Sequence, residues 1–378
     1  MSIPELLLHH KRIHPEILQS LLQFAENQYW DTKDFHKIAQ ELEEFIHNLP
    51  SEENLDELWY VLVKILFFAG DLKKLSDVYT SITATSQGIP GVRTFYALAL
   101  TFQGHSEEGL RILNNTNIDE ISDPQIRIEA LGINLFFHSI RRDQKKVDDL
   151  YQKIIHLSET VPELTERQKA HLLPWAYIRK AYSIRGQTTR ALDLLNKVQT
   201  ELNIFPHRFF QIMTSLRIGH IYHISGDFNK AIELYDQAID LAMEVQSWHL
   251  LSMIYNRVGF ILTAQRQVNE ARGYFQDSLD YAKKSGARWL TVGPLVNLIR
   301  WKLNQGRIDE AIEDYHTFAK ITESVGDEQE QFYALLALAE LYAQIDDMPK
   351  SKYYYSKGVK LGLKLGLFRL VDQSKENN

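Results

Sequence analysis

The chain has 378 residues, of which 44% are hydrophobic and 24% are charged, a balance typical of a soluble protein that buries a core. Its net charge of -7 argues against a general nucleic-acid binder, because such proteins carry a strong positive field. The absence of cysteine excludes disulfides, thiolate metal sites and cysteine nucleophiles.

The apolar stretches near the N-terminus are too short for an export signal or a membrane span. Only Leu6 to Leu8 run together before histidines and charges follow, and Lys64 interrupts the stretch that comes closest to a span, residues 59–70. We therefore expect a cytoplasmic protein that makes no contact with a membrane.

In chain order, the sequence predicts four parts. Residues 1–30 are expected to form a capping helix, and residues 31–165 a series of divergent helical repeats. Residues 166–365 are expected to form regular repeats of forty residues, and residues 366–378 a C-terminal cap and frayed tail. Within the divergent part, a turn followed by a helix is predicted at residues 70–79, 104–113 and 142–151.

One helical phrase returns five times in the regular part. Its first residue is a turn residue, at positions Gly186, Gly226, Arg266, Gly306 and Asp346. Its sixth residue is small, as seen in Ala191, Ala231, Ala271, Ala311 and Ser351. Its tenth residue is large and apolar, as seen in Leu195, Tyr235, Phe275, Tyr315 and Tyr355. Residues four apart share one face of a helix, so the small residue admits a neighbouring helix and the large one fills the space beside it.

A second helix is predicted before each turn, for example at residues 207–225 and 248–265. Gly219 and Gly259 stand seven residues before their turns, where the lack of a side chain permits tight packing within the helix pair. Each repeat is thus expected to consist of helix A, a tight turn and helix B, and Asp227 is expected to cap or charge the start of its helix B.

This pattern resembles the tetratricopeptide repeat. The resemblance rests on one repeat above all, in which the family positions are filled by Ile218, Gly219, Tyr222, Gly226, Asp227, Ala231, Tyr235 and Ala238. It implies an all-α fold, a right-handed α-solenoid of helix-turn-helix repeats. Repeats of forty residues look like those of the Rap-type quorum-sensing regulators and of sensor arms in signalling ATPases.

Pro174 and Pro294 occupy the same register, twelve residues before their turns. Each is expected to start helix A or to kink it, because proline lacks the N–H group that a helix interior needs.

No catalytic or cofactor signature is found. The sequence lacks a P-loop, a GxGxxG motif, an HExxH motif and a GxSxG motif, so we expect no enzyme, no catalytic residue and no cofactor. His10 and His14 are spaced for one helical face, but a solvated face is the better interpretation and no metal is expected.

The resemblance also implies where a partner binds, because the A helices of such arrays line the concave inner face. On that face we expect cationic and titratable side chains, a side-chain amide for a peptide backbone, and apolar surface. The predicted binding residues are Lys180, His220, His223, Asn256, Phe260, Arg300, Met213, Met253 and Tyr333. Together they suit a peptide with apolar anchors and a carboxylate.

The pattern therefore favours a non-catalytic interaction module, an adaptor or scaffold that binds a protein or peptide in its concave groove. The alternative is a peptide-responsive regulatory sensor, as the resemblance to Rap-type regulators implies. An RNA-binding helical repeat is disfavoured by the acidic net charge.

Overall fold

The computed structural model describes residues 35–48, 55–82, 88–184, 186–324, 326 and 328–367. These residues form helices and no strand. The helices of the first part are α3 (Phe35–His47), α4 (Asp56–Ala69), α5 (Leu72–Ser81), α7 (Pro90–Phe102), α8 (Ser106–Asn114), η1 (Ile118–Glu120), α9 (Pro124–Ile140), α10 (Gln144–Thr160), α11 (Glu166–Leu172) and α12 (Pro174–Ser183). Those of the second part are α13 (Thr188–Ile204), α14 (Arg208–Ile224), α15 (Phe228–Glu244), α16 (Trp248–Ala264), α17 (Val268–Ser285), α18 (Arg288–Asn304), α19 (Ile308–Ser324), α20 (Glu328–Gln344) and α21 (Met348–Lys364).

The repeat turns have the backbone that the sequence predicts. All five turn residues have a positive φ, with 83° at Gly226 and 71° at Gly306. Arg266 and Asp346 adopt the same conformation with φ of 64° and 61°, although they are not glycine. The amide of Asp227 bonds back to the carbonyl of Tyr222 over 2.9 Å, which satisfies a carbonyl at the end of α14.

Tight packing within each helix pair follows from the glycine in helix A. A Cβ atom added at Gly219 would lie 2.6 Å from Cε1 of Tyr235, and one at Gly259 would lie 2.6 Å from Cε1 of Phe275. Both rings are buried. The prediction that small residues here allow close approach is confirmed.

Two aspartates of the regular repeats, Asp227 and Asp347, cap the B helices that follow them. The Asp227 carboxylate accepts from the Lys230 amide over 3.3 Å, and the Asp347 carboxylate accepts from the Lys350 amide over 3.2 Å. Asn269 lies inside α17 instead, where its side-chain oxygen accepts from the Trp301 ring N–H over 3.2 Å.

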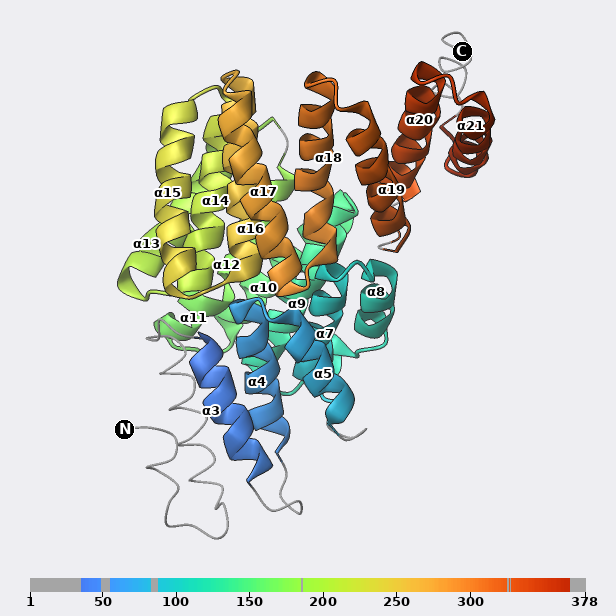
Figure 1. The fold of residues 1–378 in the computed structure, drawn as a ribbon. Helices are drawn as coiled ribbons and strands as arrows, with labels where there is room; N and C mark the ends of the chain where they lie inside the picture. The colour runs from blue at the N-terminus through green and yellow to red at the C-terminus, as the bar shows by residue number, and fades with distance from the viewer. Residues whose placement is uncertain are drawn as a thin grey trace.

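The two helices of each repeat form two layers with different spacing. Successive A helices pack on one another from α12 through α14 and α16 to α18. Successive B helices, such as α15 and α17, make at most marginal contact within the described part of the chain. Because the A helices are closer together, the array curves with the A layer on its inner side (Figure 1).

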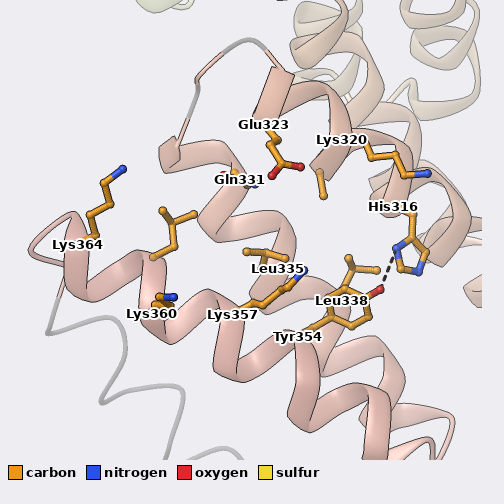
Figure 2. A pocket seen from close by; sticks show the side chains of 12 residues that line it. His316, Lys320, Glu323, Gln331, Leu335, Leu338, Tyr354, Lys357, Lys360 and Lys364 are labelled. Atoms are coloured by element: carbon orange, nitrogen blue, oxygen red, sulfur yellow. Dashed lines mark hydrogen bonds between the residues drawn. The ribbon is translucent and has the colours of Figure 1, made fainter.

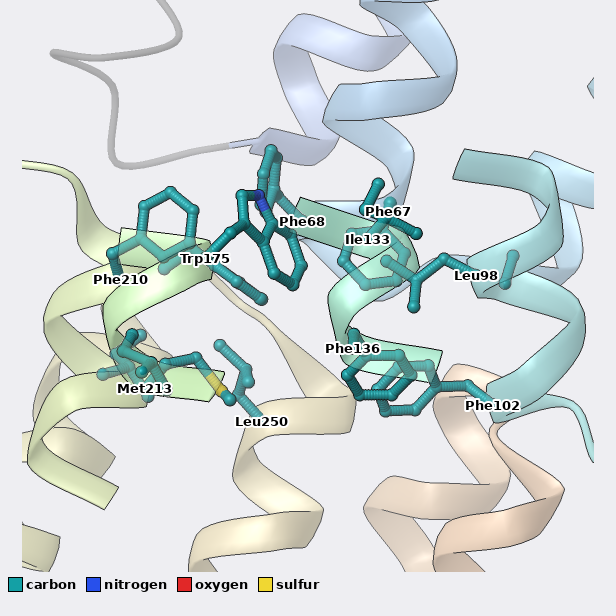
Figure 3. Packing of buried hydrophobic residues seen from close by; sticks show 14 of the residues in the cluster. Phe67, Phe68, Leu98, Phe102, Ile133, Phe136, Trp175, Phe210, Met213 and Leu250 are labelled. Atoms are coloured by element: carbon teal, nitrogen blue, oxygen red, sulfur yellow. The ribbon is translucent and has the colours of Figure 1, made fainter. Parts of the chain in front are cut away.

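The curvature brings the first and second parts of the chain together. The Ser247 hydroxyl donates to the Phe68 carbonyl over 2.8 Å, a contact between residues 179 apart in sequence. The ring of Phe102 lies 6.0 Å from that of Trp289, and α7 packs on α18. The solenoid therefore closes on itself through one hydrophobic core, in which Phe67, Phe102 and Leu250 lie near one another (Figure 3).

Lys64, which interrupts the apolar run of α4, is buried in this core. Its ammonium group lies 2.7 Å from the carboxylate of Glu129 in α9, and both side chains are less than one-tenth exposed. The Tyr60 hydroxyl donates to the same carboxylate. The charge of Lys64 thus links α4 to α9.

The two prolines have different positions. Pro174 begins α12, as predicted. Pro294 is expected to start helix A or to kink it, and it does not start it, because α18 begins at Arg288 and continues past Pro294 to Asn304. The Asn297 side chain donates to the Gly293 carbonyl over 2.9 Å, whereas the carbonyl that lacks an amide donor because of Pro294 is that of Leu290.

Some predictions concern residues outside the described part of the chain. The capping helix at 1–30 and the tail beyond residue 367 lie there, as does the pair His10 and His14. The boundary between divergent and regular repeats at residue 165 stays a prediction. Among the described helices, none is both long and apolar enough to cross a membrane.

Candidate functional site

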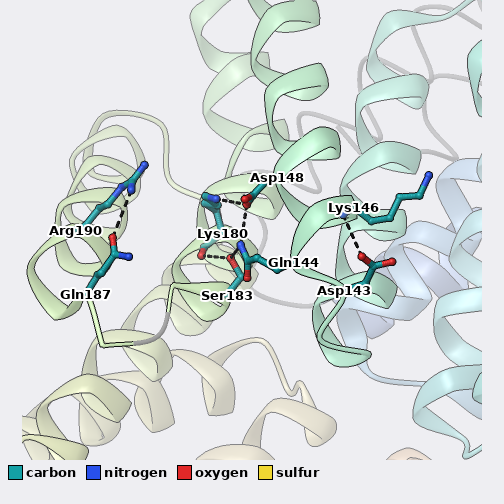
Figure 4. Close-up of polar contacts among 8 residues, drawn as sticks. All are labelled: Asp143, Gln144, Lys146, Asp148, Lys180, Ser183, Gln187 and Arg190. Carbon is teal, nitrogen blue, oxygen red and sulfur yellow. Dashed lines mark hydrogen bonds and ion pairs between the residues drawn. The ribbon is translucent and has the colours of Figure 1, made fainter.

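Lys180 lies at the end of α12, where it faces the B helix of the preceding repeat. Its ammonium group forms an ion pair with Asp148 of α10, and the Gln144 side chain donates to the same carboxylate over 2.7 Å (Figure 4). The hydrogen bond from Lys180 is the main reason why the pKa of Asp148 is lowered. Lys180 is therefore already partnered.

A cavity of about 540 Å³ opens beside this pair. Its lining includes Lys180, Tyr182, Ser183 and Arg190, which come from α12 and α13. Tyr182 also contacts the next A helix. The guanidinium group of Arg217 in α14 lies 3.9 Å from the centre of the Tyr182 ring.

Four basic side chains of α14 and α16 form what we call the cationic wall, namely Arg217, His220, His223 and Arg257. Arg217 is 8% exposed and donates to the Ala181 carbonyl over 3.0 Å. The rings of His220 and His223 are 6.2 Å apart. Within the described residues, no carboxylate forms an ion pair or hydrogen bond with any of the four.

The titration of the histidines reflects this one-sided environment. Burial, with Arg257, Arg217 and His223 nearby, lowers the pKa of His220 to about 4. Burial and Arg257 also lower the pKa of His223. Both rings are therefore neutral at pH 7, and an anion beside them would favour their protonated forms.

Several buried polar atoms along the wall have no hydrogen-bond partner within the described residues. These atoms are Nδ1 of His220, Nδ1 of His223, Nε of Arg217, Oδ1 of Asn256 and the hydroxyl of Tyr235. Each of these atoms is shielded from solvent, and the hydroxyl of Tyr235 belongs to a fully buried side chain.

The structure brings some of the predicted residues together and separates others. His220, His223 and Asn256 lie on neighbouring A helices at the cationic wall. Met213 is 5% exposed and belongs to the core beside Phe210 and Leu250 (Figure 3).

The remaining predicted residues lie further along the A layer. Phe260 is half-buried, with its ring 5.7 Å from that of Phe275, and Met253 packs against the core. Arg300 and Tyr333 are exposed, on α18 and α20. The predicted residues are therefore spread along the A helices from α12 to α20, and the exposed ones are on α18 and α20.

Sequence reasoning missed Arg217 and Arg257. Both stand nine residues before their turn residues, at Gly226 and Arg266, and so occupy the same register forty residues apart. A search for charged residues that recur at the same position of successive repeats would have found them. No cluster of three or more metal-ligating side chains occurs in the part of the chain that the structure describes.

The chain is similar to one protein family and to several solved structures. Residues 210–284 match the tetratricopeptide repeat family. The chain is similar to a Rap protein crystallised with competence and sporulation factor, with 14% identity and a TM-score of 0.55, over 93% of this chain and 99% of that chain. It is also similar to aspartyl phosphate phosphatase F from Bacillus subtilis, with 14% identity and a TM-score of 0.50, over 93% and 95% of the two chains.

A third similar structure is a signal transduction ATPase with a tetratricopeptide repeat sensor, from Pyrococcus horikoshii. The identity is 11% and the TM-score 0.52, over 96% of this chain and 57% of that chain. No curated protein matches the sequence significantly. At these identities the likeness establishes a shared fold. Residues 210–284 therefore match tetratricopeptide repeats, and the chain as a whole shares the all-α solenoid fold of these structures.

Proposed function

We propose that the chain binds a carboxylate-bearing segment of a partner protein or peptide against the cationic wall. The observation that carries this proposal is the set of four basic side chains with no carboxylate partner among the described residues. The proposed role is that of an adaptor or scaffold that acts by binding rather than by catalysis. The proposed setting is the cytoplasm, because a chain without cysteine needs no oxidising compartment to fold.

The neighbouring residues supply the other contacts that such a segment needs. Asn256 stands next to Arg257 on α16 and is half-buried, and its side-chain amide is of the kind that pairs with a peptide backbone. Phe260 and Tyr333 offer aromatic surface for apolar side chains. An extended peptide has all of these groups, whereas the acidic net charge of the chain disfavours a nucleic acid.

The proposal is tested by peptide retention on the immobilised full chain. The probes are two pools of short random peptides, one with free and one with amidated C-termini, and the retained peptides are identified by mass spectrometry. We expect acidic or free-carboxylate peptides to be enriched, and Arg257→Gln to weaken binding of the retained peptides about tenfold.

Lys283→Gln is the matched control, because Lys283 is an exposed cation on α17, away from the wall. We expect it to bind like the wild type. Equal retention by wild type and Arg257→Gln, or no preference for negatively charged peptides, would show that the cationic wall is not the binding site.

The second candidate function is a peptide-responsive sensor. It is favoured by the contact between Phe68 and Ser247, because a ligand that alters the curvature would make or break it. Small-angle scattering with and without a retained peptide decides between the two. A change in radius of gyration supports the sensor, and an unchanged radius supports the static scaffold.

A further inference from the structure

A second cavity, of about 660 Å³, lies between α19, α20 and α21, on the far side of the array from the cationic wall. Side chains from all three helices surround it (Figure 2). The B helices α19 and α21 both pack on α20 but at most marginally on each other in the described chain, so α20 forms the floor between them.

The floor of this cavity is apolar and one end is closed. Leu335 and Leu338 of α20 form the floor, with Ala319 beside them. The rings of His316 and Tyr354 lie 5.3 Å apart and join α19 to α21 at one end. The cavity is thus a short groove with an aromatic end wall.

The rim of the groove is basic. Lys357, Lys360 and Lys364 stand three and four residues apart on α21, and so follow one face of the helix along the groove. Lys320 faces them from α19, and Glu323 is the one acidic residue among the described lining residues. Lys364 forms an ion pair with Glu328, whereas Lys320 and Lys360 have no carboxylate partner within the described residues.

The basic rim is specific to this end of the array. Lys320 and Lys360 occupy the register that holds Asp240 and Asp280 in the two preceding repeats. The repeat fold therefore tolerates either sign of charge at this position. The chain as a whole has a net charge of -7, so four lysines around one groove are a local departure that folding does not require.

We propose that this groove, which we call the lysine groove, binds an amphipathic helix of a partner protein. That helix would carry Asp or Glu at positions i, i+3 and i+7 on one face and leucine-like residues beside them. A helix matches the spacing of the three lysines on α21, and its apolar side chains would pack on the half-buried Ala319 and Leu361. An extended nucleic acid or polyphosphate would satisfy the lysines but has no apolar side chain to place there.

The test uses a synthetic helical peptide with glutamates at this spacing and leucines on the adjacent face, titrated into the full chain by fluorescence anisotropy. A peptide of the same composition, with the glutamates moved to the opposite face, is its control. We expect the first peptide to bind at least tenfold more tightly than the second.

Three variants locate the binding. We expect Lys360→Glu to weaken binding at least tenfold through like-charge repulsion, and Ala319→Phe to weaken it similarly because the ring fills the groove without a change of charge. Lys352→Glu, at an exposed lysine of α21 outside the lining, is expected to bind like the wild type. Circular dichroism of each variant checks that it is folded.

Four outcomes would overturn the proposal. The first two are equal binding of the two peptides and no binding at about 1 mM peptide. The third is tighter binding of single-stranded RNA or anionic vesicles at the same lysines. The fourth is a concentration-dependent dimer that Lys360→Glu dissociates. The last would make a second copy of the chain the occupant. None of these measurements involves the cationic wall, so the result is independent of the proposed function.

Discussion

Gly219 and Gly273 are both helical glycines, but their surroundings predict opposite effects of the same substitution. A Cβ atom added at position 219 would meet the buried ring of Tyr235 at 2.6 Å, whereas one added at position 273 would meet no heavy atom within 4 Å. We expect Gly219→Ala to destabilise the fold by about 1–3 kcal/mol. We expect Gly273→Ala to stabilise it by about 1 kcal/mol, because alanine favours the helix.

Chemical denaturation of the two variants measures both effects. If Gly219→Ala changed the free energy of unfolding in the same direction as Gly273→Ala, this would mean that the helix pair relaxes around the methyl group added at position 219.

His220 predicts a pH dependence of partner binding at the cationic wall. Its pKa of about 4 in the free chain leaves it neutral at pH 7, and a bound carboxylate would raise that pKa. The complex then holds more protons than the free chain, so binding should become tighter as the pH falls from 7.5 to 5.5. Titration calorimetry of a retained peptide at both values measures the change, and His220→Asn should reduce it. Binding that weakens over this range would contradict the prediction.

At the scale of residues, the sequence predicted those features that recur with the repeat. The turn residues and the close packing at Gly219 belong to this class, because each depends on neighbours within one helix pair. It could not predict the burial of Met213 or the ion pair of Lys180 with Asp148, because these depend on contacts between repeats whose register varies.

At the scale of elements, Lys64 and Glu129 join α4 to α9 through a buried ion pair. Removal of Lys64 leaves the carboxylate of Glu129 buried without its counter-ion, with the Tyr60 hydroxyl still donating to it, so we expect Lys64→Met to destabilise the fold by about 3–5 kcal/mol. In the double variant Lys64→Met/Glu129→Gln, no charge remains, and most of that loss should be recovered. Denaturant unfolding of the single and double variants measures the coupling. Additive losses in the double variant would show that the pair contributes nothing as a pair.

The order and type of the elements could be predicted from the sequence, but their mutual spacing could not. The helices predicted at 207–225 and 248–265 are found as α14 and α16. The sequence did not show that α18 continues through Pro294, because packing of the helix against its neighbours can outweigh the loss of one backbone hydrogen bond. The lysine groove was also missed, because it depends on how far α19 and α21 stand apart.

At the scale of the whole molecule, three buried histidines predict sensitivity to acid. Burial lowers the pKa of His249 to about 3, that of His171 to about 4, and that of His207 well below its usual value. The folded chain keeps these rings neutral, whereas the unfolded chain protonates them below pH 6.5. Stability is therefore undiminished above pH 6.5 and falls as the pH drops toward 4, by about 2 kcal/mol each for His249 and His171 at pH 5.

His249→Gln tests this dependence, because glutamine cannot titrate. We expect the difference in unfolding free energy between pH 7.5 and pH 5 to shrink by about 2 kcal/mol in this variant. His105→Gln, at an exposed histidine, serves as the control and should leave the difference unchanged. If the pH dependence of the unfolding free energy is unchanged in His249→Gln, groups other than His249 cause the acid sensitivity.

The closure of the array is the feature that the sequence pattern could least predict. A repeat pattern describes contacts between neighbours, whereas His249 lies against Gly70 and Ser247 against Phe68. Both contacts depend on curvature accumulated over several repeats, to which each repeat adds a small rotation.

The contact between Phe68 and Ser247 also affects how the chain is made on the ribosome. Synthesis adds about 5–20 residues per second, so Ser247 follows Phe68 after roughly 9–36 s. During that interval the aromatic residues at the end of α4 lack their later partners, and they are exposed to chaperones or to other nascent chains. The closed solenoid thus makes the early repeats depend for their final burial on a segment that is translated much later.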